Sequence, residues 1–98
     1  MKINPQVQID NEQEFVKLLL QNNSTAQKLL YEKFSPKMLS VCRSYIPDFH
    51  AAEDCMIKAF VKIFRNISSF KSVGSLEGWM RKIMVNECLD NLKSTRKI

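Results

Sequence analysis

The chain has 98 residues, is 45% hydrophobic and 26% charged, and contains only 2 glycines and 3 prolines. This length allows one domain at most, the hydrophobic content excludes a disordered chain, and the scarcity of glycine and proline disfavours a turn-rich β-sandwich. We therefore expect an all-α fold, a compact bundle of four to five helices. We assign this domain to residues 11–98, after a flexible lead-in at residues 1–10.

The formal net charge of +5 is unevenly distributed. Basic and acidic side chains balance in residues 1–34, whereas residues 35–98 contain eleven basic and six acidic side chains. A basic half on a neutral half indicates a polyanionic partner on one side. The alternative is a solvated basic surface with no partner.

No membrane insertion, metal site or cofactor is predicted. No apolar stretch approaches the roughly 20 residues that span a bilayer, and no signal peptide follows Met1, so we expect a cytoplasmic protein. The three cysteines, Cys42, Cys55 and Cys88, are widely spaced, with no CxxC pair and a single histidine, His50. We interpret them as small buried hydrophobic residues in a reducing compartment.

Two capping-box patterns predict where the first two helices begin. Asp10 with Gln13, and Ser24 with Gln27, have the spacing at which the two side chains cap each other's backbone N–H groups. The first helix should end at Asn22. The second helix should therefore begin directly after a short asparagine turn.

Two prolines affect the second predicted helix and its junction with the third. Pro36 lies inside the second helical pattern and predicts a kink or break near residues 34–36, and Pro47 ends the segment. Asp48 is the expected N-cap of the third helix. Its apolar residues recur at helical spacing: Ala52, Met56, Phe60, Ile63 and Ile67.

A polar loop at Ser68–Gly74 precedes the last helix, for which Ser75 is the expected cap. Apolar residues surround much of this helix, so we expect neighbours on more than one side. Its polar stripe is narrower, because Lys82, Asn86 and Lys93 project within about 40° of one another.

Catalysis finds little support. His50 has no serine or cysteine partner in an evident pair, and neighbouring Glu53 and Asp54 point about 100° apart on a helix. The chain has no phosphate-binding glycine loop. We therefore expect no enzyme activity and name no catalytic residue.

Nucleic-acid binding is better supported. Phe70, if exposed on the loop, could stack on a displaced base, and Asn86 could hold a base edge. Basic side chains could neutralise phosphates, namely Lys82, Lys93, Arg96 and Lys97. Each feature has an alternative, in which Phe70 plugs the end of the helix stack, the lysines form a solvated face and Asn86 bonds locally. Trp79 is interpreted as a core residue.

The chain resembles region 2 of bacterial sigma factors, specifically the extracytoplasmic-function group. The likeness extends from about Ala26 to Arg96 and includes LLYEKFSPKMLSVCRSYI and AAEDCMIKAFVKIF, which is similar to the family's clamp-binding helix. A third motif has the family's order and spacing: Phe70, Trp79-Met80, Ile83, Asn86 and Leu89-Asp90. Together, the motifs occur in the family's order and spacing.

The resemblance implies a domain that docks on the β′ clamp helices of core RNA polymerase and recognises the promoter minus-ten element. It would capture a flipped base from the non-template single strand. The residues implied in DNA binding are Ser68, Ser69, Phe70, Lys71, Ser72, Lys82, Asn86, Lys93 and Arg96. Those implied in polymerase binding are Asp54, Ile57, Lys58 and Val61.

Two departures from the family pattern accompany this likeness. Ile57-Lys58 replaces the usual Gln-Glu pair, and the 98 residues do not include the family's second DNA-binding domain. An anti-sigma factor could cover the same surfaces. The alternative function is a helical protein–protein interaction module without nucleic-acid binding.

Overall fold

The computed structural model describes residues 11–72 and 74–96, which form four α-helices and one short 3₁₀ helix. The expected all-α bundle is confirmed, while the lead-in assigned to residues 1–10 lies outside the described residues. The elements are α1 (Glu12–Leu20), α2 (Ser24–Tyr45), α3 (Phe49–Arg65), η1 (Ile67–Ser69) and α4 (Leu76–Arg96).

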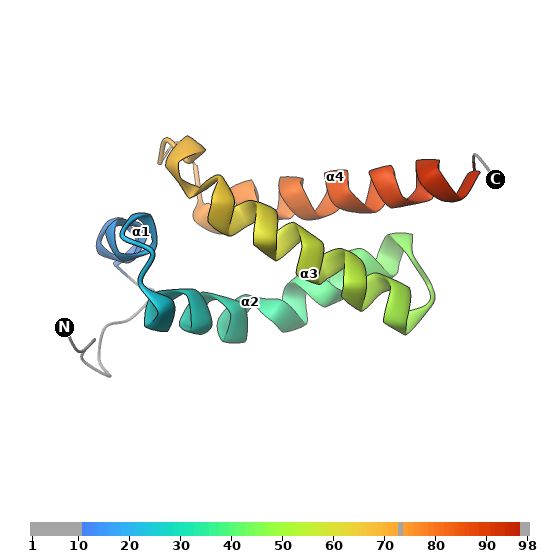
Figure 1. Ribbon diagram of the computed structural model, residues 1–98, viewed down its shortest axis with the longest axis horizontal. Coiled ribbons are helices and arrows are strands. Elements are labelled where there is room, and N and C mark those ends of the chain that lie inside the picture. Colours follow the sequence, from blue (N-terminus) through green and yellow to red (C-terminus); the bar gives the residue numbers. More distant parts are fainter. Residues whose placement is uncertain (1–10, 73, 97–98) are drawn as a thin grey trace.

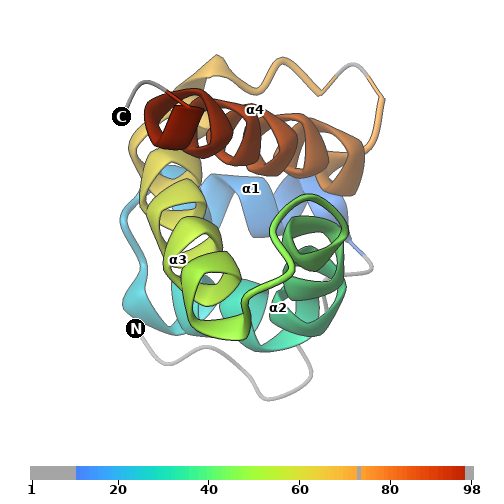
Figure 2. The same ribbon diagram turned by 90° about the vertical axis from the view of Figure 1, so that its right-hand side faces the viewer.

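Three long helices, α2, α3 and α4, pack against one another, and α1 contacts α2 and η1. Figure 1 shows α1 at one end of the long bundle, and the end-on view in Figure 2 shows it crossing behind the other helices. The connector from η1 to α4 is therefore at the same end as α1. Within the described residues, no helix is long and apolar enough to cross a membrane.

The core forms where the apolar faces of the helices meet. All five residues of the predicted α3 stripe are buried, which confirms the helical spacing. Full burial of an aliphatic or aromatic side chain contributes roughly 1.5–3 kcal/mol. No polar or charged residue is buried among the described residues.

Side-chain caps set the starts of the helices, but two lie one residue away from the predicted positions. Asp48 caps α3 and Ser75 caps α4, as expected. The caps of α1 and α2 are instead Asn11 and Asn23, whose amide oxygens accept the N–H groups of residues 14 and 26. The predictions for these two starts are wrong because asparagine caps as well as aspartate or serine does.

Pro36 does not break α2, which is continuous from Ser24 to Tyr45. Figure 1 shows the helix changing direction near its middle, as the missing backbone donor of a proline allows. The predicted break is therefore wrong, and the predicted kink is confirmed. Pro36 and Glu32, four residues earlier, are both exposed, so the carbonyl left without a donor can bond to water.

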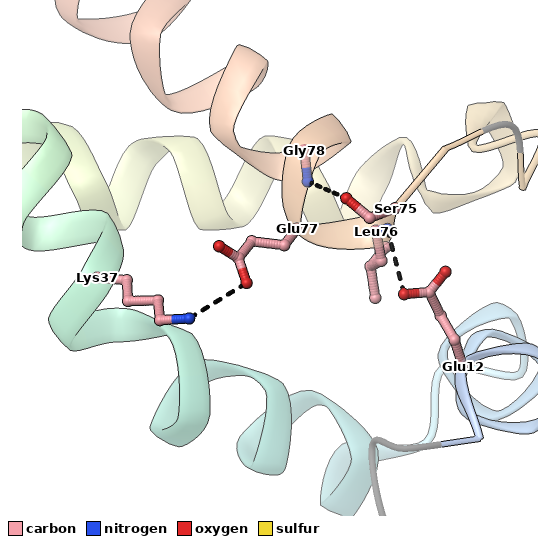
Figure 3. Close-up of polar contacts among 6 residues, drawn as sticks. All are labelled: Glu12, Lys37, Ser75, Leu76, Glu77 and Gly78. Atoms are coloured by element: carbon pink, nitrogen blue, oxygen red, sulfur yellow. Dashed lines mark hydrogen bonds and ion pairs between the residues drawn. The ribbon is translucent and has the colours of Figure 1, made fainter.

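Three polar contacts fix the start of α4 (Figure 3). The Ser75 hydroxyl accepts the Gly78 N–H at 2.9 Å, the Glu12 carboxylate accepts the Leu76 N–H at 3.2 Å, and Lys37 pairs with Glu77 at 3.4 Å. These contacts come from the connector, α1 and α2. They therefore orient the start of α4 relative to α1 and α2.

The cysteines are buried, as predicted. Burial raises the pKa of the Cys55 thiol to about 12 and that of Cys88 to about 11, and the pKa of Cys42 is also raised, mainly by burial. The folded chain therefore holds these protons more tightly than the unfolded chain does.

We expect the free energy of unfolding to fall as pH rises above about 9. The thiols of the unfolded chain titrate near their ordinary value of 9.0, whereas Cys55 and Cys88 stay protonated to about 12 and about 11 when folded. The folded state then binds more protons, so raising the pH favours unfolding. Urea denaturation followed by circular dichroism at pH values from about 8 to 9.5, where most lysine and tyrosine side chains are still protonated, measures this.

The matched control is the double variant Cys55→Ala, Cys88→Ala. Its free energy of unfolding should be lower at every pH but should change less between these pH values. Parallel pH profiles for the two proteins would contradict the assignment.

Candidate nucleic-acid interface

The ring of Phe70 is buried, with 7% of the residue exposed. It packs against Trp79 at the start of α4, with the ring centroids 5.5 Å apart. The Phe70 N–H donates to the carbonyl of Ile67, which closes η1 and turns the chain there. The predicted exposed ring is wrong, because burying a phenyl ring against the core is worth more than leaving it in a polar loop. Phe70 plugs the helix stack, the alternative that the sequence left open.

The rest of the described connector is exposed, as a binding loop requires. Ser68, Ser69, Lys71 and Ser72 all face solvent. Ser72 and Gly74 have positive φ values of 59° and 79°, which turn the chain back toward α4. The polar part of the predicted loop is therefore accessible, although its aromatic residue is not.

A groove of about 370 Å³ lies between the end of α3, η1 and the first turns of α4. This volume falls within the usual range of ligand pockets. Trp79 and Ile83 form its apolar side, while amide, hydroxyl and charged groups form the remainder. Its lining residues are Lys62, Asn66, Ser69, Trp79, Ile83, Asn86 and Glu87.

Asn86 connects this groove to a second hollow. It is exposed, and it also lines a depression of about 380 Å³ on α4 together with Gly78, Arg81, Lys82 and Val85. The structure thus brings Asn86 and Ser69 to the same groove, and Lys82 to the adjoining hollow. One amide side chain faces both spaces, with donors and acceptors available to a ligand in either.

An ion pair between Lys62 and Glu87 joins α3 to α4 at the edge of the groove. The hydrogen bond and the charge of Glu87 raise the pKa of Lys62. The Lys62 side chain is 52% exposed, so the pair contributes about 1 kcal/mol or less to stability. Its main effect on the groove is that Glu87 already neutralises the charge of Lys62.

Three predicted DNA-binding lysines remain unpaired in the part of the chain that the structure describes. Lys71, Lys82 and Lys93 are exposed, and no described carboxylate pairs with them. Lys82 and Lys93 share a face of α4 with Asn86, as the helical spacing predicted. The side chain of Arg96 and the whole of Lys97 lie outside the described residues.

The four residues assigned to polymerase binding lie together on the outer face of α3. Asp54, Ile57, Lys58 and Val61 follow one another at steps of three, one and three, and all are exposed. Ile57 is 44% exposed and Val61 42% exposed. Two branched apolar side chains therefore face solvent on the side of α3 away from the core.

Sequence reasoning missed Trp79, Asn66 and Ile83 as groove residues, having interpreted Trp79 as core. Trp79 is only partly buried. The sequence did contain a signal for two of these residues, because Trp79 and Ile83 recur at helical spacing with Asn86 and so share one face of the helix with it. Asn66 follows α3 as its C-cap residue, and its side-chain amide donates to the Lys62 carbonyl at 2.8 Å.

The profile of the Sigma-70 region 2 family matches residues 30–98. The chain belongs to this family. The match covers α3, η1 and α4 completely and most of α2. Both the groove and the outer face of α3 are therefore within region 2.

Two individual proteins are similar to this chain. The chain is 24% identical to the RNA polymerase sigma-H factor of Pseudomonas aeruginosa over 83 residues, which is 85% of this chain but 43% of that protein. It is similar in structure, with a TM-score of 0.82 and 23% identity, to an engineered region 2 of sigmaE in complex with GTAAAA, over 97% of this chain and 96% of the other. The second likeness confirms the fold.

We expect Phe70→Ala to destabilise the domain by about 3–5 kcal/mol, because it removes a buried ring and leaves a cavity beside Trp79. Phe49→Ala is the matched control, since that ring is exposed at the start of α3 and should cost about 1 kcal/mol or less. Urea denaturation of both variants measures the difference. Equal stability of the two variants would contradict the packing described for Phe70.

Proposed function

We propose that this chain is the promoter-recognition domain of a transcription initiation factor of the extracytoplasmic-function group. It binds core RNA polymerase and captures a flipped base of the non-template strand at the minus-ten element. The observation that carries the proposal is the groove in which Trp79, Asn86 and Ser69 meet, beside Lys82, which pairs with no carboxylate of the described residues. The protein acts in the cytoplasm by binding, with no catalytic step of its own.

The groove offers the groups that an unstacked base needs. The indole of Trp79 provides an aromatic wall, and stacking of a base on an aromatic ring contributes roughly 1–3 kcal/mol. Asn86 and Asn66 carry amides that can hydrogen-bond to a base edge, and the hydroxyl of Ser69 can do the same. Phe70 takes no part in stacking and instead supports Trp79 from beneath.

The flanking lysines suit the phosphates of the same strand. Lys82 borders the groove through the hollow that it shares with Asn86, and Lys71 lies on the connector. Lys93 extends the stripe along α4. The structurally similar region 2 of sigmaE was solved in complex with GTAAAA, which supports a short nucleic-acid ligand for this fold.

Base capture by the isolated chain should be weak. Extruding a base from a duplex costs a few kcal/mol, which one aromatic wall and a few lysines offset only in part. The polymerase would supply the remaining surface. We therefore expect the isolated chain to prefer single-stranded DNA, in which the bases are already free of a partner strand.

The outer face of α3 is proposed as the docking surface for the β′ clamp helices. Ile57 and Val61 can bury apolar area against a partner helix, while Asp54 and Lys58 provide charges of both signs at the rim. Ile57 and Lys58 replace the family's usual polar pair, so this contact would depend more on apolar burial. An anti-sigma factor could compete for the same face.

We expect Asn86→Ala to weaken binding of a minus-ten non-template oligonucleotide by about 1 kcal/mol or more, because it removes the amide that lines the groove. Lys82→Ala should reduce the slope of log K against log salt by about 0.7, the contribution of one phosphate contact on a single strand. Fluorescence anisotropy titrations at several salt concentrations measure both effects.

Lys28→Ala is the matched control, since that exposed lysine is on α2 and pairs with Glu32. Its affinity and salt slope should equal those of the wild-type protein. Binding that does not distinguish single-stranded from duplex DNA, and that neither Asn86→Ala nor Lys82→Ala alters, would contradict the proposed interface.

We expect Ile57→Ala and Val61→Ala each to reduce retention of the protein on an immobilised β′ clamp-helix fragment without changing its melting temperature by more than a few degrees. Leu20→Ala, which alters an exposed leucine on α1, is the control and should bind normally. If the wild-type protein ignores the clamp fragment and DNA but retains another helical partner, the alternative of a protein interaction module is favoured.

A further inference from the structure

Three cysteine thiols meet in the core between α2, α3 and α4. Cys42 comes from α2, Cys55 from α3 and Cys88 from α4, and their exposed fractions are 0%, 2% and 0%. All three Sγ atoms lie within 4.8 Å of one another, and those of Cys55 and Cys88 are 3.6 Å apart. All are free thiols. They have no part in the proposed binding of DNA or polymerase.

The spacing of the sulfur atoms matches that of a three-sulfur coordination site. Bonds of about 2.3 Å from three thiolates to one central atom place the sulfurs about 3.5–4 Å apart, depending on the bond angles. The Cys55–Cys88 separation is within this range, and the upper bound of 4.8 Å requires only a small approach by Cys42. Each ligand is on a different helix, so all three helices would be linked.

We propose that Cys42, Cys55 and Cys88 form a binding site for a trivalent thiophilic metalloid, with arsenite, As(OH)₃, as the ligand. Each thiol gives its proton to one hydroxyl group of the arsenite. Three S–As bonds form, three As–O bonds break and three water molecules leave. Arsenic remains trivalent throughout, so the reaction needs no oxidant or reductant.

Charge selects this ligand over other soft ions. Three thiolates on As(III) give a neutral centre, whereas three thiolates leave a net charge of −1 on Zn²⁺ and −2 on Cu⁺. A buried net charge is costly, and no positive side chain is buried with the cysteines among the described residues. The charge of Glu87 also acts on these thiols and opposes an anionic centre.

The protonation of the thiols agrees with this selection. A cysteine thiol with its ordinary pKa is already neutral at physiological pH, and burial raises the pKa of all three further. A divalent or monovalent cation must first displace these protons and then leave a charged complex in an apolar core. Condensation with As(OH)₃ starts and ends with neutral species.

The experiment is native mass spectrometry of the chain kept reduced with a phosphine and incubated with sodium arsenite. We expect one arsenic per chain, with a mass that corresponds to loss of three protein protons and all three hydroxyl groups. Because only the folded state holds the three thiols together, excess arsenite should also raise the melting temperature by about 5 °C or more. Parallel samples receive zinc sulfate or a Cu⁺ complex in place of arsenite.

Single variants test each ligand. Cys42→Ala, Cys55→Ala and Cys88→Ala should each weaken arsenite binding about 100-fold or more, since loss of groups that merely support a ligand already costs 10- to 100-fold. Met84→Leu is the control, because it changes the thioether 3.9 Å from the Cys42 sulfur and keeps all three thiols. It should bind one arsenic, as the wild-type protein does.

Three outcomes would overturn the proposal. The wild-type protein may remain free of arsenic after prolonged incubation, or its complex may retain a hydroxyl group, which indicates two sulfur bonds. Tighter binding of zinc or Cu⁺ would disprove the assigned ligand. The first two readouts use only the wild-type protein, so they decide the matter even if an alanine variant fails to fold.

Discussion

The contact between Phe70 and Trp79 fixes where the connector meets α4. The two rings lie 5.5 Å apart, and the chain between them contains two residues with left-handed backbone conformations. With Phe70 anchored in the core, Ser69 stays at the surface on one side of the groove, and Trp79 lines it from α4. The groove depends on this contact, because releasing the ring would free the connector from the helix that carries Asn86.

Ion pairing divides the basic side chains of the surface into those that are neutralised by a carboxylate and those that are not. Lys62 lines the groove but is paired with Glu87, and Lys37 is paired with Glu77 at the start of α4. Both pairs connect neighbouring helices. Lys71, Lys82 and Lys93 have no such partner within the described part of the chain, so their charges remain available to the phosphates of the proposed function. Net charge alone could not make this distinction.

The cysteine cluster is chemically distinct from the end of the bundle at which α4 starts. The start of α4 is held by polar contacts with α1 and α2, whereas α2, α3 and α4 meet farther along at three thiols in an apolar setting. Sulfur side chains pack as well as small aliphatic ones there. The same atoms are ligands for soft elements, which is the property that the proposed arsenite site uses. Their convergence is independent of the groove and of the outer face of α3.

Local rules in the sequence determined the helices, the buried stripe of α3 and two of the four caps, because periodicity and capping act over three or four residues. They also placed Lys82, Asn86 and Lys93 on one face and left Ile57 outside the core stripe. Only the tertiary structure decided that Phe70 is buried, that Trp79 lines the groove and that Lys62 is occupied by Glu87. It also brought Cys42, Cys55 and Cys88 together. Each of these depends on how one helix lies against another, and packing between segments distant in sequence leaves no signal in local spacing.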